Sequence, residues 1–244
     1  MNGHLLLSIA GLTKVFGGLV AVNQISFDVH AGEVVGLLGP NGSGKTTLMN
    51  LVSGALRPTQ GSVALEGRRI SGLAPHRIAR AGVARSFQLV RVLPSLSALE
   101  NVMVGAVFGP DRLAPDAAAT VARALLERVG LGGREQLHPA EMTYIDQKRI
   151  ELARALAADP KVLLLDEWLA GLNPTELQTG IELIRSLQAE GRTVLMVEHV
   201  MDAIRSLCNR CVVMSAGSKL AEGTPAEVLA NPDVIRAYLG DEHA

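Results

Sequence analysis

The segment Gly36–Leu48 constrains the fold more than any other part of this chain, because its residue types suit one backbone arrangement. Within it, Gly39–Thr46 fits the pattern G-x-x-x-x-G-K-[ST] at every fixed position. The preceding residues Glu33–Leu38 predict a short buried strand, and Thr47–Val52 predict the start of a helix. A strand, a glycine loop and a helix in this order are what the P-loop motif requires.

Backbone chemistry makes a P-loop a phosphate-binding structure. Glycines let several N–H groups point inward and let the chain approach phosphate oxygens closely. The helix N-terminus adds partial positive charge at the same place. Lys45 is expected to reach the β- and γ-phosphates of a nucleotide, and the Thr46 hydroxyl to ligate Mg²⁺. The alternative, a glycine-rich turn with an unrelated lysine, is disfavoured by the flanking strand and helix.

Length and composition limit the organisation of the chain. Its 244 residues suit one domain, or one domain with an inserted subdomain. Hydrophobic residues make up 48% and aromatic residues only 3%, so the core is expected to be aliphatic. A net charge of −1 gives no basic footprint, so no nucleic-acid partner is expected. No apolar run approaches the roughly 18 residues of a membrane span, and no signal-type leader is present, so we expect a cytosolic chain that serves a membrane only through a partner.

Hydrophobic periodicity predicts the other elements. Strands are expected at 5–16, 20–29, 62–67, 83–88, 211–214 and 219–222. A short helix is expected at 75–81, a helix at 174–188, and a helical region interrupted by Asn231-Pro232 at 226–239. The stretch 89–140 is expected to form a helical insert, with helices at 96–107 and 117–129 and a further helix at 143–158. Cys208 and Cys211 lack two further zinc ligands at suitable spacing, so we interpret them as structural thiols in a reducing compartment.

A second motif follows the expected buried strand Lys161–Glu167. Two carboxylates, Asp166 and Glu167, stand at its carboxyl end, where ligands bind in parallel α/β sheets. This is a Walker B pattern. Asp166 is expected to hold Mg²⁺ directly or through water, and Glu167 to orient or deprotonate the attacking water. The alternative, surface decoration, is uncommon for adjacent carboxylates after an apolar strand.

Three further residues are less specific on their own. His199 follows the expected strand Thr193–Val197, and we interpret it as a hydrogen-bond donor to the γ-phosphate rather than as a structural histidine. Phe16 precedes a flexible Gly-Gly pair and could stack on a purine base, although a place in the core stays open. Gln88 ends an expected strand and carries little information alone.

The order of these motifs resembles that of ATP-binding cassette (ABC) ATPases, and the resemblance covers essentially the whole chain. The matching order is Gly39–Thr46, Gln88, a signature-like helix start near Thr143, Asp166-Glu167 and His199. The resemblance implies an α/β P-loop NTPase fold with a RecA-like core and an antiparallel β flank, at about 1–88 and 159–225. It places a helical subdomain at about 89–158 and a C-terminal helical tail at 226–244.

The same resemblance implies the cofactors and the site. ATP and Mg²⁺ are the expected cofactors, in a head-to-tail dimer where each ATP lies between one chain's P-loop and the other's signature. Glu167 and His199 are the implied catalytic residues, and residues 89–110 face membrane subunits. The implied metal ligands are Thr46, Gln88 and Asp166. The implied nucleotide contacts are Phe16, Gly39, Pro40, Asn41, Gly42, Ser43, Gly44, Lys45, Thr46, Thr47, Gln88, Thr143 and Asp166.

Finer details are similar to cassettes for branched-chain amino-acid uptake, a likeness shared by importers of amides or urea. They lie at Ile150–Leu156, Ala170–Pro174, Val197–His199 and the ending Ala237–Gly240. This likeness implies integral membrane permease subunits, a second cassette of the same or a related chain, and a periplasmic or extracellular solute-binding protein. It also implies a cytoplasmic, peripheral position on the inner face of the cell membrane.

The chain departs from the family pattern at two places. The signature usually reads Leu-Ser-Gly-Gly-Gln or Leu-Ser-Tyr-Gly-Gln, whereas Met142–Asp146 reads Met-Thr-Tyr-Ile-Asp. Ile145 replaces a glycine where backbone approaches the nucleotide, and Asp146 brings negative charge near phosphate unless it turns away. Trp168 stands where proline usually follows the Walker B glutamate. We therefore expect slow hydrolysis at the site that this signature completes, and we favour a heterodimer with a related cassette.

Three other functions are compatible with an ABC ATPase fold. A non-transport ABC protein of DNA repair or of ribosomes usually carries long coiled-coil insertions or two cassettes, and this chain has neither. A regulatory cassette that clamps ATP with weak hydrolysis is favoured by the altered signature and disfavoured by the retained Glu167 and His199. A lipid or lipopolysaccharide export ATPase is similar in length and ending.

Overall fold

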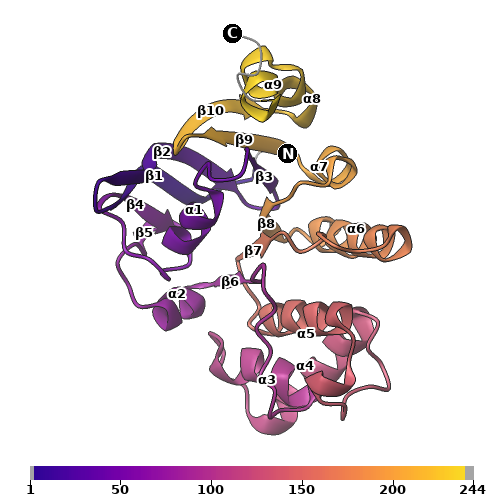
Figure 1. Cartoon of the computed structure of the whole chain (residues 1–244). Helices are drawn as coiled ribbons and strands as arrows, with labels where there is room; N and C mark the ends of the chain where they lie inside the picture. Colours follow the sequence, from indigo (N-terminus) through magenta and orange to yellow (C-terminus); the bar gives the residue numbers. More distant parts are fainter. Residues whose placement is uncertain (1–2, 240–244) are drawn as a thin grey trace. The chain divides into compact units, whose positions relative to one another are not determined.

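The computed structural model describes residues 3–239 and divides into two compact units. Unit 1 combines Met1–Pro75 with Leu169–Ala244, and unit 2 is the continuous segment His76–Trp168 (Figure 1). The subdomain limits expected from the sequence stay a prediction. Within the described residues, no helix is both long and apolar enough to span a bilayer.

The first sheet of unit 1 is antiparallel, with strand order β2-β1-β4-β5. Its strands are β1 (Leu5–Phe16), β2 (Leu19–His30), β4 (Gln60–Leu65) and β5 (Arg68–Arg69). Strand β2 buries Ile25, Phe27 and Val29 in alternation, which is the period-two pattern of a sheet with one buried face. The strand expected at 20–29 is confirmed, with one more residue at each end.

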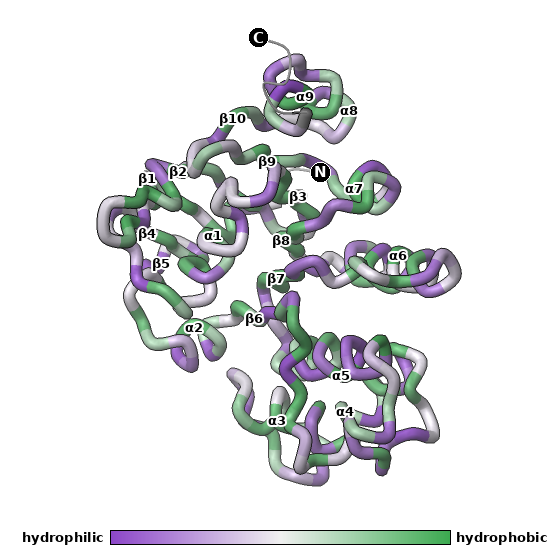
Figure 2. Tube along the Cα trace, in the orientation of Figure 1, coloured by the Kyte–Doolittle hydropathy of each residue, from purple (hydrophilic) through white to green (hydrophobic). Residues whose placement is uncertain are grey.

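The second sheet of unit 1 contains the P-loop strand. Its order is β10-β9-β3-β8, and β3 lies parallel to both β8 and β9. Every residue of β3 and β8 is buried, as expected for strands covered on both faces. Figure 2 shows these strands as mainly hydrophobic segments. The bounds are β3 (Val34–Leu38), β8 (Thr193–Val197), β9 (Arg210–Ser215) and β10 (Ser218–Gly223).

Within residues 3–239, five helices complete unit 1. They are α1 (Lys45–Val52), α6 (Pro174–Ala189), α7 (Met201–Leu207), α8 (Pro225–Ala230) and α9 (Pro232–Leu239). Proline stands at the start of α6, α8 and α9, where a missing N–H removes no helical hydrogen bond. Asn173 and Glu176 form a capping box on α6. The break expected at Asn231-Pro232 separates α8 from α9, because the proline cannot continue the preceding helix.

Unit 2 joins a two-stranded parallel β pair to three packed helices. Its elements are α2 (Pro75–Ala81, beginning one residue before the unit), β6 (Val83–Arg85), α3 (Ala98–Phe108), α4 (Pro115–Arg128), the 3₁₀ helix η1 (Pro139–Glu141), α5 (Tyr144–Ala157) and β7 (Val162–Asp166). Strand β6 pairs with β7. The expectation that the strand at 83–88 continues to Gln88 is wrong, because β6 ends at Arg85 and the next residue, Ser86, accepts the Asp166 N–H of β7 with its side chain rather than with its backbone.

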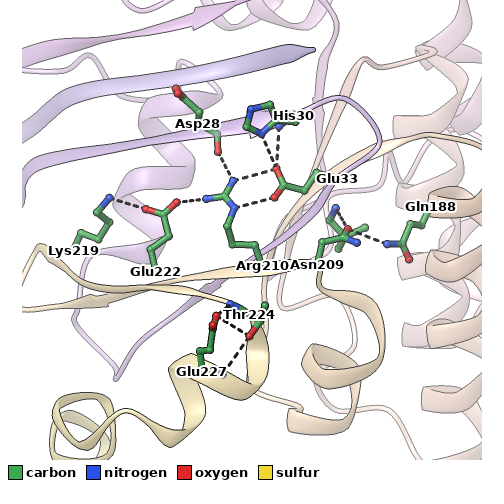
Figure 3. Close-up of polar contacts among 11 residues, drawn as sticks. Asp28, His30, Glu33, Gln188, Asn209, Arg210, Lys219, Glu222, Thr224 and Glu227 are labelled. Carbon is green, nitrogen blue, oxygen red and sulfur yellow. Dashed lines mark hydrogen bonds and ion pairs between the residues drawn. The ribbon is translucent and has the colours of Figure 1, made fainter. Parts of the chain in front are cut away.

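Arg210 of β9 links several elements of unit 1 through its guanidinium group (Figure 3). Its guanidinium donates to both carboxylate oxygens of Glu33, from Nε at 2.9 Å and from Nη2 at 3.1 Å. It also bonds the Glu222 carboxylate of β10 and the Asp28 carbonyl of β2. One side chain therefore fixes both sheets and the β9–β10 hairpin relative to the turn that precedes the P-loop strand.

Candidate functional site

The P-loop of unit 1 joins the end of β3 to the start of α1. Gly39 has φ +143° and Gly44 has φ +102°, which L-residues with a Cβ rarely adopt. A Cβ on Gly39 would lie 2.1 Å from the Met214 carbonyl oxygen, and one on Gly44 would lie 2.4 Å from the Ala21 carbonyl oxygen. Both glycines are therefore required by close packing against β2 and β9 as well as by backbone conformation.

The polar groups of this loop suit a phosphate. Lys45 is buried, and its Nζ donates to the carbonyl oxygens of Gly39 at 2.6 Å and Pro40 at 2.9 Å. Ser43 Oγ is buried and makes no hydrogen bond within residues 3–239. Gly44 starts α1 without a side-chain cap, so first-turn N–H groups are available to an anion. The exposed Thr46 lies in that first turn, where the sequence places an Mg²⁺ ligand.

Two other predicted residues lie in unit 1. The Phe16 ring at the end of β1 is 43% exposed, so the alternative that placed it in the core is wrong. Lys14 Nζ lies 5.0 Å from the ring centroid, and its stacking role stays a prediction. His199 follows β8 and is exposed, and its contact with the γ-phosphate stays a prediction. Its neighbour Glu198 is fully buried and accepts a hydrogen bond from the Leu169 N–H at 2.7 Å.

The Walker B aspartate lies in unit 2 at the end of β7. Asp166 is 1% exposed, and its Oδ2 binds Arg85 Nη2 at 2.7 Å, an arginine whose side chain is itself only 5% exposed. The Asp166 N–H donates to Ser86 Oγ at 3.3 Å. Its other oxygen, Oδ1, is buried and has no hydrogen-bond partner among the described residues. An anionic oxygen with spare coordination suits the metal-bound water of an Mg²⁺ ion.

Glu167 is held by its neighbours in an unusual backbone conformation. Its φ is +51°, and its carboxylate accepts a 2.8 Å hydrogen bond from Gln88 Nε2. The buried Lys148 of α5 donates to the carbonyl oxygens of Glu167 at 3.4 Å and of Trp168 at 3.1 Å. Trp168 Nε1 donates back to the Lys148 carbonyl oxygen at 3.3 Å. These hydrogen bonds hold the backbone of Glu167 and Trp168 against helix α5.

The signature region begins α5. Thr143 is its N-cap; its Oγ accepts from the Asp146 N–H and donates to Asp146 Oδ2 at 2.7 Å. Asp146 is 4% exposed and also binds Arg134 Nη1 at 2.9 Å and Arg149 Nη1 at 3.5 Å. The Asp146 carboxylate therefore turns inward, and its negative charge is paired with two arginines. Ile145 remains partly exposed beside it.

The structure therefore collects the predicted residues in two groups. Unit 1 holds Phe16, the P-loop residues and His199, whereas unit 2 holds Gln88, Thr143, Asp166 and Glu167. Sequence reasoning missed Arg85 and Lys148, and it did not connect Tyr238 with the P-loop. A basic residue within an apolar stretch, such as Arg85 in β6, was the signal that could have pointed to a buried ion pair, since buried charges are normally paired.

The loop, the buried aspartate and the adjacent glutamate define a P-loop nucleotide-binding ATPase. Comparison with known proteins then identifies the family. Residues 22–170 match the ABC transporter family, and residues 218–244 match the family described as branched-chain amino acid ATP-binding cassette transporter. The chain belongs to the ABC transporter family, and it is an ATPase of that family.

Several relatives match over nearly the whole chain. The high-affinity branched-chain amino acid transport ATP-binding protein LivG of Salmonella typhimurium is 41% identical, covering 97% of this chain and 98% of the relative. BraF of Pseudomonas aeruginosa, of the same description, is 40% identical over the same shares. A probable LivG of Archaeoglobus fulgidus is 34% identical over 96% of this chain and 95% of its own.

Solved structures confirm the expected fold class. A nucleotide-free ATP-binding cassette from an ABC transporter has a TM-score of 0.87 at 28% identity, covering 97% of this chain and 100% of its own. A cassette in its ADP conformation has a TM-score of 0.85 at 29% identity, covering 97% and 99%. The fold is that of the ABC ATPases.

Proposed function

We propose that this chain is the ATP-hydrolysing subunit of an importer for branched-chain amino acids or a related amide- or urea-type solute. The observation that carries the solute class is the likeness to LivG over 97% of the chain, which includes the C-terminal segment 218–244. Its place is the inner face of the cell membrane, on integral permease subunits. A solute-binding protein outside the membrane delivers the solute to those permeases.

The residues divide the chemistry of hydrolysis among them. Mg²⁺ would supply charge neutralisation at the transferred phosphoryl group. Thr46, Gln88 and Asp166 would hold this ion, as the family resemblance implies. Lys45 binds the β- and γ-phosphates, exchanging its present carbonyl acceptors for phosphate oxygens. Glu167 orients the attacking water and accepts a proton from it, and the Gln88 amide donates a hydrogen bond to the same carboxylate.

Exposed apolar residues support a permease contact on unit 2. Leu89 is 77% exposed, Leu93 is 39% exposed and Phe108 is 64% exposed. All three belong to the segment 89–110 that the family resemblance assigns to the membrane subunits. Apolar side chains left in water at this density favour a protein interface over a solvated surface.

The altered signature favours a second cassette of a different sequence. The single hydroxyl proton of Thr143 is donated to Asp146, so a γ-phosphate has to compete for it. Ile145 places a branched side chain where the family has glycine. We infer that this signature completes a slow site, whereas the chain's own P-loop, Asp166 and Glu167 serve a fast site completed by the partner. A cassette that only clamps ATP is the second candidate, favoured by the same two residues.

Solute uptake by cells tests the proposed function. The gene is deleted, and uptake of labelled leucine, urea and acetamide is measured with and without plasmid-borne wild type or Glu167→Gln. We expect leucine uptake to be lost, restored by wild type and not restored by Glu167→Gln. Loss of urea or acetamide uptake alone would correct the solute class, and unchanged uptake of all three would refute an import function.

The partner question needs a separate measurement. Glu167→Gln traps an ATP sandwich if one forms, and analytical ultracentrifugation with and without Mg-ATP detects it. We expect the isolated variant to stay monomeric and to dimerise with ATP only when the second cassette is added. ATP-dependent self-dimerisation would contradict the heterodimer.

A further inference from the structure

The C-terminal helix α9 contacts the nucleotide loop of unit 1. The backbone N–H of Gly39, the first P-loop residue, donates a 2.7 Å hydrogen bond to the Tyr238 hydroxyl oxygen. The two residues are 199 positions apart in sequence, so the contact exists only in the folded unit. Helix α9, which comes after α8 at the yellow end of the chain in Figure 1, therefore reaches the first residue of the phosphate-binding loop.

This contact links Tyr238 through Gly39 to Lys45, the lysine that is expected to bind phosphate. Gly39 is bonded on both sides: its N–H is held by Tyr238, and its carbonyl oxygen accepts from Lys45 Nζ at 2.6 Å. Between these bonds the backbone has φ +143°, and the Met214 carbonyl leaves no room for a side chain. A glycine has many conformations to lose, so this peptide needs external hydrogen bonds to stay in one orientation.

Tyr238 is well placed to supply that constraint. Val234, one turn earlier in α9, is 2% exposed and anchors the helix in unit 1. Burial raises the pKa of the Tyr238 phenol above its ordinary value of 10.0, although the Gly39 N–H opposes this, so the hydroxyl is neutral at physiological pH. Tyr238 as a whole is 39% exposed, so its ring contributes less to the core than that of a fully buried tyrosine.

We propose that Tyr238 is a positioning residue of the nucleotide site, which holds Gly39 so that Lys45 is oriented for phosphate and couples the docking of α9 to nucleotide binding. The inference rests on the proposed function, since it concerns the same P-loop. Coupling is reciprocal: if a docked α9 strengthens nucleotide binding, bound nucleotide strengthens the docking of α9 by the same factor. The C-terminal segment is then a place where a partner or a modification can change nucleotide affinity without entering the site.

The test compares Tyr238→Phe with Arg236→Gln in the full chain. Both changes lie on α9, but Arg236 is exposed and pairs only with Asp233 among the described residues. Dissociation constants for Mg-ADP and for inorganic pyrophosphate are measured by calorimetry. A neutral hydrogen bond contributes roughly 0.5–1.5 kcal/mol, so we expect Tyr238→Phe to raise both constants about 2- to 12-fold. Arg236→Gln is expected to leave both unchanged.

Hydrogen exchange of α9 provides a readout that needs no substitution. ADP is expected to slow amide exchange in α9 of the unmodified chain, and to lose that effect in Tyr238→Phe. The inference would be overturned if Tyr238→Phe bound ADP and pyrophosphate as tightly as the unmodified chain. It would also be overturned if ADP did not change amide exchange in α9 of the unmodified chain. Neither result would contradict the ATPase function. An unmodified chain that binds no Mg-ADP would overturn both together.

Discussion

The ion pair between Arg85 and Asp166 gives the sharpest prediction about stability. Replacing Arg85 with methionine keeps a long apolar side chain in place and removes the charge. The Asp166 carboxylate is then buried without compensation, since its Oδ1 already has no hydrogen-bond partner within the described residues. Breaking a buried pair in this way costs about 3–5 kcal/mol. For a chain of this size that corresponds to a melting temperature lower by roughly 6–20 °C.

The assay is a double-mutant cycle with Asp166→Asn, measured without Mg²⁺. Urea unfolding is followed by the fluorescence of Trp168, the single tryptophan, which is buried two residues from Asp166. Removing both charges together avoids an uncompensated buried ion, so the double variant is expected to be more stable than Arg85→Met alone. The expected coupling energy is at least about 2 kcal/mol.

An exposed pair serves as the control. Arg236 and Asp233 form an ion pair whose side chains are 72% and 59% exposed, so Arg236→Met is expected to leave the unfolding midpoint unchanged. Additive effects of Arg85→Met and Asp166→Asn within about 0.5 kcal/mol would refute the reasoning, because they would mean that the two charges do not stabilise each other.

Three further results are expected. Burial raises the pKa of Glu33, but the hydrogen bonds from Arg210 and from the His30 backbone N–H outweigh burial and lower this pKa to below its ordinary 4.5. The stability that this carboxylate contributes is therefore present above pH 4.5 and is lost as pH falls through the folded-state pKa. Glu33→Gln is expected to flatten that part of the pH profile of urea unfolding midpoints. Gly39→Ala abolishes Mg-ADP binding in calorimetry, whereas Gly67→Ala, with nothing within 4 Å of its added Cβ, preserves it. Cys208 is 8% and Cys211 0% exposed, so a chromogenic disulfide reagent is expected to find both thiols only after unfolding.

Local patterns predicted most of the elements around the P-loop. The buried strand before Gly39 and the helix after Lys45 follow from short apolar runs and from glycine placement, which are properties of neighbouring residues. The interruption at Pro232 followed from proline chemistry in the same way. The end of β6 at Arg85 could not be predicted in the same way, because it depends on which residues pair with β7, a strand distant in sequence.

Long-range partners of the site were beyond sequence reasoning. Arg85 and Asp166 lie 81 residues apart, and nothing in either local sequence names the other. The orientation of Asp146 was left open for the same reason, since Arg134 comes from the segment before η1. Motif spacing identified which residues carry the chemistry, whereas the groups that orient them are set by tertiary packing.

The division of unit 1 between both ends of the chain fixes an order of events during synthesis. Unit 2 is continuous, so all of its residues are available once residue 168 has left the ribosome. Strand β3 is made early, but both of its neighbours in unit 1, β8 and β9, come from residues 193–215. The nascent P-loop therefore waits for most of the chain, and nucleotide capture is among the last properties that the growing protein acquires.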